Sequence, residues 1–137
     1  MLRIGLNPYG LAYAVGLQGA GTPRANPSPI GFDGFMVLAR RDRTPAGYAV
    51  VEIHTGPDDT WPVGDAYAEV QSLAVSPDER GSGLGSRLMD AVDAELIHRG
   101  VHDLAVGVLA GNEDAIRFYE RRGLRPGELQ MWRFGDK

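Results

Sequence analysis

The sequence predicts one α/β domain built on a mixed, mostly antiparallel sheet that is flanked by helices. Two features in the order of the elements predict this class. Three strand-like segments follow one another with only turns between them, which is typical of an antiparallel meander. The pattern then alternates helix, strand, helix and strand, and a right-handed crossover makes the strands around the first helix a parallel pair. The length fits a single domain, residues 1–137.

Residues 1–34 differ in composition from the rest of the chain. They hold 11 of the 28 glycines and prolines but only three charged residues. Glycine and proline at this density break helices, so a strand at Leu2–Leu6 is the one regular element expected here. The apolar stretch Leu11–Leu17 is short and flanked by glycines. We therefore expect an atypical, loop-rich N-terminal arm whose apolar residues pack on the main body, residues 35–134.

The main body begins with the meander. Its strands are expected at Phe35–Ala39, Gly47–His54 and Ala66–Val75. The polar segment Arg40–Ala46 predicts a turn between the first two strands. A loop rich in proline, aspartate and glycine, Thr55–Gly64, separates the last two.

A helical period follows the meander. Apolar residues recur every four positions, at Leu84, Leu88, Val92 and Leu96. Gly100 is placed to end this helix, which we expect at Leu84–Arg99. Asp103–Ala110 is then almost continuously apolar, as in a strand covered on both faces.

A second helix and a last strand complete the pattern. Asn112 is placed to cap the helix Glu113–Arg122, whose first turn is acidic, and Gly123 follows its end. Glu128–Phe134 is expected to form the last strand.

The composition excludes several classes of protein. A formal net charge of −4 argues against a nucleic-acid partner and favours cationic substrates. No apolar run approaches the ~20 residues of a membrane span, so no membrane partner is expected. The absence of cysteine excludes disulfides and a cysteine nucleophile, and it fits a reducing, cytoplasmic location. The histidines lack metal-ligand spacing, so no metal is expected: His54, His98 and His102.

The strongest functional signal is the glycine-rich segment Ser76–Gly85, between a strand and an amphipathic helix. Because the turn carries so little side chain, N–H groups of the turn and of the helix N-terminus can converge on a ligand, and Arg80 adds a positive charge. This arrangement suits a diphosphate. A tight turn with a solvated Arg80 is the alternative. Two nucleotide motifs do not match, because Ser86 replaces a glycine of the dinucleotide fingerprint and no Gly-Lys-Ser/Thr is present.

Two segments of the chain carry a resemblance to a known family. The first is LAVSP at 73–77 followed by R-x-x-G-x-G at 80–85, and the second is NEDAIRFYERRGL at 112–124. In this order, with a helix and a strand between them, they resemble the GNAT superfamily of N-acetyltransferases over residues 35–134. The first segment is similar to the acetyl-CoA motif of that family. The second has Leu124 where phenylalanine is usual.

The resemblance implies an enzyme that moves the acetyl group of acetyl-CoA to a primary amine, of a small molecule, peptide or protein, by direct transfer in a ternary complex. Acetyl-CoA is then the co-substrate, and its pantetheine arm enters a splay between the parallel strands Ala66–Val75 and Asp103–Ala110. A non-catalytic acyl-CoA-binding or regulatory domain is the alternative. The implied cofactor-binding residues are Leu73, Val75, Arg80, Gly81, Ser82, Gly83, Leu84, Gly85, Ser86, Asn112 and Tyr119.

The resemblance also implies three catalytic groups. The Leu73 N–H would polarise the thioester carbonyl, and Tyr119 would be the general acid that protonates the departing thiolate. Glu69 matches the position of a catalytic glutamate and would accept the amine proton, directly or through water. Strand alternation predicts one shared face, unless a bulge interrupts it, for Tyr67, Glu69, Gln71 and Leu73.

Each of these roles has an alternative. Tyr119 could pack in the core beside Phe118, and Asn112 could be a helix cap without a ligand. Glu69 could be an exposed strand carboxylate or a group that only binds substrate. The spare candidates for the base are Glu52 and His54.

Both ends of the chain depart from the family pattern. Residues 1–34 leave room for a strand but not for the two helices that usually wall the acceptor side, and the C-terminus has space for one strand instead of two. An uncovered sheet edge invites pairing, so we expect a homodimer through Glu128–Phe134. Acidic and aromatic side chains before the third strand of the meander either hold a cation or form a solvated turn: Asp58, Asp59, Trp61 and Asp65.

Overall fold

The computed structural model describes residues 2–6, 11–18, 33–55 and 65–136, with the backbone alone for the first two ranges. The chain forms two compact units, Met1–Gly107 and Val108–Lys137. In the described residues, no helix is long and apolar enough to cross a membrane.

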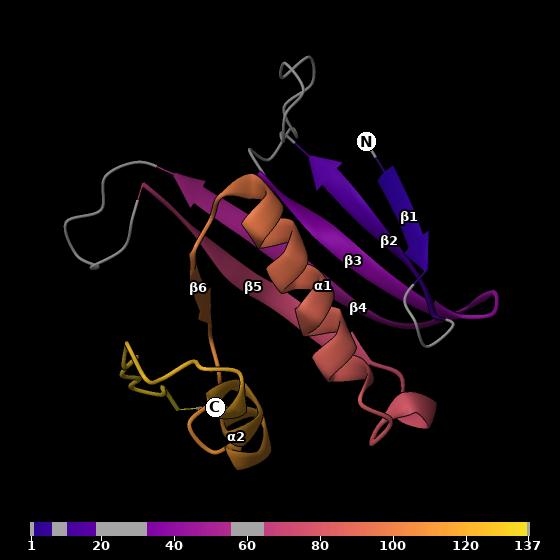
Figure 1. The fold of residues 1–137 in the computed structure, drawn as a ribbon. Helices are drawn as coiled ribbons and strands as arrows, with labels where there is room; N and C mark the ends of the chain where they lie inside the picture. Colours follow the sequence, from indigo (N-terminus) through magenta and orange to yellow (C-terminus); the bar gives the residue numbers. More distant parts are fainter. Residues whose placement is uncertain (1, 7–10, 19–32, 56–64, 137) are drawn as a thin grey trace. The chain divides into compact units, whose positions relative to one another are not determined.

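The first unit is built on a six-stranded sheet in the order β1-β2-β3-β4-β5-β6 (Figure 1). Each neighbouring pair up to β5 is antiparallel, and β5 with β6 is parallel. The prediction of a mostly antiparallel sheet with one parallel pair is therefore confirmed. The strands are β1 Leu2–Leu6, β2 Leu11–Gln18, β3 Gly34–Arg41, β4 Thr44–Thr55, β5 Ala66–Val75 and β6 Asp103–Val106.

The strand β2 was not expected from the sequence. It pairs with β1 on one side and along all eight of its residues with β3 on the other. Hydrogen bonding on both sides overrides the low strand propensity of Gly16. The expectation of a loop-rich arm is therefore wrong for the described residues of this segment, which form a hairpin.

The β3–β4 hairpin is tighter than predicted. Its strands run on to Arg41 and from Thr44, so the polar turn shrinks to the two residues between them. One of these, Asp42, has a φ of 56°, a conformation that aspartate tolerates better than most residues. The predicted loop at 55–64 lies almost entirely outside the described residues.

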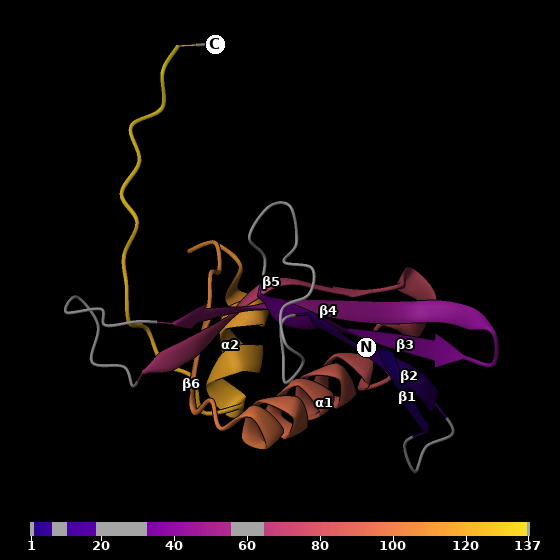
Figure 2. The same ribbon diagram turned by 90° about the horizontal axis from the view of Figure 1, so that it is seen from above.

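Helix α1, Leu84–Arg99, has the predicted bounds and lies along one face of the sheet (Figure 2). Its apolar stripe is buried against β3, β4 and β5. Gly47 of β4 has no room for a side chain, because a Cβ there would lie 3.1 Å from Leu88 of the helix and 2.8 Å from the carbonyl oxygen of Ala74 in β5. Gly100, with a φ of 71°, ends the helix as expected. The largest fully buried side chains are Phe35, Leu84, Leu88, Met89, Val37, Val51 and Val92.

Strand β6 is shorter than the predicted Asp103–Ala110, and its side chains are half-buried rather than fully covered. It pairs with Tyr67–Val70 only. The pairing stops one residue before a β-bulge in β5, and a bulge bends and twists its strand away from a straight neighbour.

The second unit contains helix α2, Glu113–Arg121, which ends one residue earlier than predicted. The Asn112 side chain accepts a hydrogen bond of 3.2 Å from the Ala115 N–H, so the predicted cap is confirmed. The predicted last strand, Glu128–Phe134, is wrong: this segment forms no strand in the structure, although the rings of Trp132 and Phe134 stack. Apolar alternation alone does not make a strand without a partner.

Candidate active site

A compact turn joins β5 to α1. The N–H of Ser76 donates to the Ala46 carbonyl (2.8 Å), and the N–H of Glu79 donates to the Ser76 carbonyl (2.9 Å). These bonds fold Pro77–Glu79 into a short 3₁₀ helix, η1, directly after the strand. The chain then reaches the start of α1 through Arg80–Gly83, of which Arg80 is exposed.

Two glycines shape the approach to α1. Gly81 and Gly83 have φ values of 80° and 85°, and a Cβ on either would meet nothing within 4 Å. Gly83 is the N-cap of α1, and no side chain caps this end. The first N–H groups of an α-helix, here on Leu84 and Gly85, have no acceptor within their own helix, and the helix dipole adds partial positive charge. The turn is therefore an open cradle for an anion.

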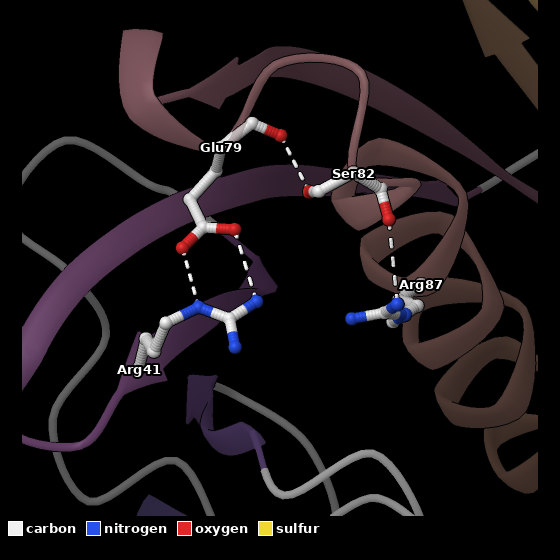
Figure 3. Close-up of polar contacts among 4 residues, drawn as sticks. All are labelled: Arg41, Glu79, Ser82 and Arg87. Carbon is white, nitrogen blue, oxygen red and sulfur yellow. Dashed lines mark hydrogen bonds and ion pairs between the residues drawn. The ribbon is translucent and has the colours of Figure 1, made fainter.

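Side chains fix this cradle from two sides (Figure 3). The guanidinium of Arg41, at the end of β3, donates two hydrogen bonds to the Glu79 carboxylate, with Nε 2.5 Å from Oε1 and Nη2 3.1 Å from Oε2. From α1, Arg87 donates a 3.3 Å hydrogen bond to the Ser82 carbonyl. The Ser82 hydroxyl donates to the Glu79 carbonyl. Arg41 and Arg87 were not among the residues expected from the sequence. Arg41 and Glu79 lie 38 positions apart, so no local signal indicates their pairing.

The Arg41–Glu79 pair also keeps both of its members ionised. The hydrogen bonds from Arg41 hold the pKa of the Glu79 carboxyl below its usual range, and Glu79 in turn raises the pKa of Arg41. Both groups are therefore ionised at neutral pH.

One edge of β5 is left open beside the cradle. The residues from Ser72 to Val75 pair with β4 on one side, but β6 accompanies β5 only as far as Val70. Within the described part of the first unit, no strand covers the other side of this stretch. An extended ligand can add its own hydrogen bonds to such an edge as an extra strand does. The open stretch contains Leu73 and Val75 and leads directly into the turn, so the structure brings these predicted cofactor residues together with Arg80–Ser86.

The β-bulge changes which side chains share a face. Val50 pairs with Ser72 and Val51 with Val70, so Gln71 is an extra residue in β5. Beyond it Leu73 pairs with Ala49, which is fully buried on the side of α1. The expectation of a shared face for Leu73 and Glu69 excepted a bulge, and this bulge is present. Its extra residue reverses the alternation and places Leu73 on the opposite face. The predicted role of Leu73 uses its main-chain N–H and does not depend on that face.

A polar cluster lies on the other face, where Glu69 pairs with Glu52 and Tyr67 with His54. His54 Nε2 is 3.3 Å from Glu69 Oε1, and the His54 ring stacks on Tyr67 with 4.7 Å between centroids. The Gln71 amide donates to both carboxylates, at 2.8 Å to Glu52 and 2.6 Å to Glu69. Three candidates for the base thus form one half-exposed network.

The remaining predicted residues belong to the second unit. Tyr119 is buried on α2, with the Phe118 ring edge-on at 5.1 Å, and burial raises the pKa of its phenol. The side chain of Asn112 caps the N-terminus of α2. Roles beside the cradle remain predictions for both residues. Of the predicted cation-binding loop, Asp58, Asp59 and Trp61 lie outside the described residues, and Asp65 is exposed.

Solved acetyltransferase structures share this fold. A putative acetyl transferase from Pyrococcus furiosus superposes with a TM-score of 0.66 at 23% identity, covering 74% of this chain and 66% of that one. An aminoglycoside N-acetyltransferase in complex with CoA superposes with a TM-score of 0.64 at 16% identity, covering 76% of this chain and 77% of that one.

The amino-acid sequence is also similar to those of known acetyltransferases. The mycothiol acetyltransferase of Thermobispora bispora is 34% identical over 96 residues, which are 69% of this chain and 30% of that protein. The chain thus spans less than a third of the length of this curated relative. The sequence model of the acetyltransferase (GNAT) family matches residues 21–124, well over half of the chain. This protein therefore belongs to the GNAT family of acetyltransferases.

Proposed function

We propose that the protein transfers the acetyl group of acetyl-CoA to a primary amine, of a small molecule, peptide or protein, by direct transfer in a ternary complex. The observation that carries the proposal is the open edge of β5, which leads into a glycine cradle at an uncapped helix N-terminus. A ligand with an extended chain and a diphosphate fits this arrangement, because the chain can bind along the strand edge and the diphosphate in the cradle.

The residues of the first unit suit acetyl-CoA. The main-chain groups of Leu73 and Val75 would bind the pantetheine arm. The diphosphate would bind at Arg80, Gly81, Ser82, Gly83, Leu84, Gly85 and Ser86. Asn112 and Tyr119 are also proposed to bind acetyl-CoA, because their segment resembles the corresponding segment of the family. Acetyl-CoA supplies an acetyl group activated as a thioester.

Three groups of the chain would then promote the transfer. The Leu73 N–H donates to the thioester oxygen and favours attack by the neutral amine. A C–N bond forms and the C–S bond breaks. Glu69 accepts the proton that leaves the amine, directly or through water, and Tyr119 donates a proton to the departing thiolate. The raised pKa of Tyr119 keeps this proton in place at neutral pH.

The acceptor side favours a cationic amine. Glu52 and Glu69 place two carboxylates on one half-exposed face, and the chain carries a formal net charge of −4. We further propose a homodimer in the cytoplasm, which the cysteine-free composition fits. We also propose that residues 1–137 form one domain.

The test is CoA release from acetyl-CoA over a panel of primary amines. Glu69→Gln and Tyr119→Phe should each lower kcat by about 10²-fold or more, as loss of a general base or acid does. The matched controls, Glu128→Gln and Tyr48→Phe, change an exposed carboxylate and an exposed phenol and should leave kcat unchanged.

Two outcomes would redirect the proposal. Unchanged turnover in both site variants would show that Glu69 and Tyr119 are not the base and the acid. If no amine supports turnover while acetyl-CoA still raises the melting temperature, the protein is an acyl-CoA-binding domain without transfer activity.

A further inference from the structure

Three potential metal ligands converge on the face of the sheet away from α1. One ligand atom from each of Glu52, His54 and Glu69 lies within 4.8 Å of the other two. His54 Nε2 is 3.3 Å from Glu69 Oε1 and 3.9 Å from Glu52 Oε2. Tetrahedral Zn²⁺ with bonds of about 2.0–2.2 Å spaces its ligands about 3.3–3.6 Å apart. The first separation matches this spacing, and the second is a few tenths of an ångström longer.

Neighbouring side chains already orient these ligands. A single amide, Gln71 Nε2, donates to the oxygens of both glutamates, and Tyr67 stacks on the imidazole. Hydrogen bonds and packing of this kind hold metal ligands in position and adjust their affinity. Gln71 is the extra residue of the β-bulge, so the bulge brings the amide to the same face as the two carboxylates.

We propose that Glu52, His54 and Glu69 form a site for one divalent transition-metal ion of the Zn²⁺ class. The imidazole selects such an ion over Mg²⁺ or Ca²⁺, which prefer ligand sets made only of oxygen. Three protein ligands leave a fourth position for water, and the side chains are half-exposed, with 32–40% of their surface accessible. The ion therefore enters from solvent, and its fourth position stays accessible.

The site has a consequence for acetyl transfer that rests on the proposed function. A Glu69 carboxylate bound to a metal ion no longer accepts a proton from the amine, and the ion repels a cationic acceptor. Metal binding and transfer then exclude each other, which makes the ion a reversible inhibitor that competes with the amine.

The direct test is titration of the metal-free protein with ZnCl₂ by calorimetry and with CoCl₂ by visible absorption. We expect one equivalent to bind. His54→Gln and Glu52→Gln should each weaken Zn²⁺ binding at least about 10-fold, and Gln71→Leu about 10–100-fold, as loss of an outer hydrogen bond does. His98→Gln, which replaces an exposed histidine in the last turn of α1, is the matched control and should bind as the wild type does.

The proposal is overturned if the wild type binds no stoichiometric Zn²⁺, if His54→Gln and Glu52→Gln both keep wild-type affinity, or if MgCl₂ binds as tightly as ZnCl₂. A separate arm measures acetyl transfer with and without ZnCl₂, and inhibition should disappear in the Glu52→Gln variant. If the wild type transfers no acetyl group at all, the proposed function fails while the titration still decides the metal site.

Discussion

The phenol of Tyr119 is a buried acid whose pKa burial raises above its ordinary value. The exposed phenol of the unfolded chain, with a pKa of about 10, ionises at lower pH than the folded one. Stability from the neutral buried phenol is therefore complete below about pH 10 and is lost as the pH rises through the folded pKa. We predict that Tyr119→Phe flattens the alkaline fall in the free energy of unfolding, measured by urea titration at increasing pH.

The matched control for this prediction is Tyr48→Phe, which changes an exposed tyrosine. Its stability should follow the wild-type curve at every pH. Identical pH dependence in wild type and Tyr119→Phe would contradict the burial of the phenol.

A second prediction concerns the ion pair that anchors the cradle. Arg41→Ala frees Glu79 and the turn that carries Ser82, so the N–H groups of the cradle are less well ordered before acetyl-CoA binds. We expect the KM for acetyl-CoA to rise about 2–5-fold, the modest effect of an exposed pair, with little change in kcat. Arg43→Ala, on the same hairpin, should leave both parameters unchanged. An unaltered KM in Arg41→Ala would show that the pair does not order the turn.

Local residue roles were more predictable than pairings between strands. Asn112 caps α2 through a bond to Ala115 only three residues away, so the sequence itself contains both partners. The contact of His54 with Glu69 depends on the register between β4 and β5, which no short motif encodes. The reversed face of Leu73 depends on one extra residue in that register.

At the scale of the element, the two ends of α1 offer a matched pair of glycines. Gly83 and Gly100 both have positive φ, and a Cβ at either meets nothing within 4 Å. Alanine at either position should cost roughly 1–2 kcal/mol of stability, because the left-handed conformation strains a residue with a side chain. Thermal unfolding measures this cost in both variants.

Only Gly83 borders the cradle, so the two variants should differ in binding. Gly83→Ala places a methyl group in the open space and shifts an N–H donor, which should weaken CoA binding about 10-fold, the effect of one hydrogen bond to a charged group. Gly100→Ala should bind CoA as the wild type does in calorimetry. Equal affinities of the two variants for CoA would show that the cradle is not part of the CoA-binding site.

Elements with a complete local signal were predicted well. Helix α1 has an apolar residue in every turn and a glycine at its end, and its predicted bounds are those of the structure. Strand β2 contains Gly16 and gives no such signal, since its stability comes from two neighbouring strands. The segment 128–134 is the opposite case, because it has the alternation of a strand but no strand partner among the described residues.

For the whole molecule, the order of elements was enough to predict a mostly antiparallel sheet with one parallel pair, although it did not reveal β2. That order requires β5 and β6 to be joined by a helical crossover, whatever the details of the loops. Most of the proposed cofactor residues could be named from the sequence because they lie in one continuous segment, from Leu73 to Ser86. The contacts among Glu52, His54 and Glu69 could not, because they are made between separate strands, β4 and β5.

The exposed C-terminal segment leads to a prediction about assembly. The side chains of four apolar residues in this segment keep 67–80% of their surface accessible: Leu129, Met131, Trp132 and Phe134. Strand β6 is the last strand of the sheet order and offers an edge for pairing. The C-terminal segment of one copy could pair with the β6 edge of a second copy, and the reverse pairing would complete a symmetric dimer. We therefore predict twice the chain mass of 14.8 kDa by size-exclusion chromatography with light scattering.

Two variants separate this dimer from nonspecific association. Trp132→Glu places a charge among the apolar side chains and should give a monomer. Gln130→Glu adds the same charge at a polar position of the same segment and should leave the dimer intact. A dimer that survives Trp132→Glu would mean that another surface joins the copies, and a monomeric wild type at every concentration would mean that the exposed segment is not an interface. In the predicted dimer, β6 and the segment would pair through main-chain groups. Deletion of residues 127–137 should therefore abolish the dimer even more completely than the single charge.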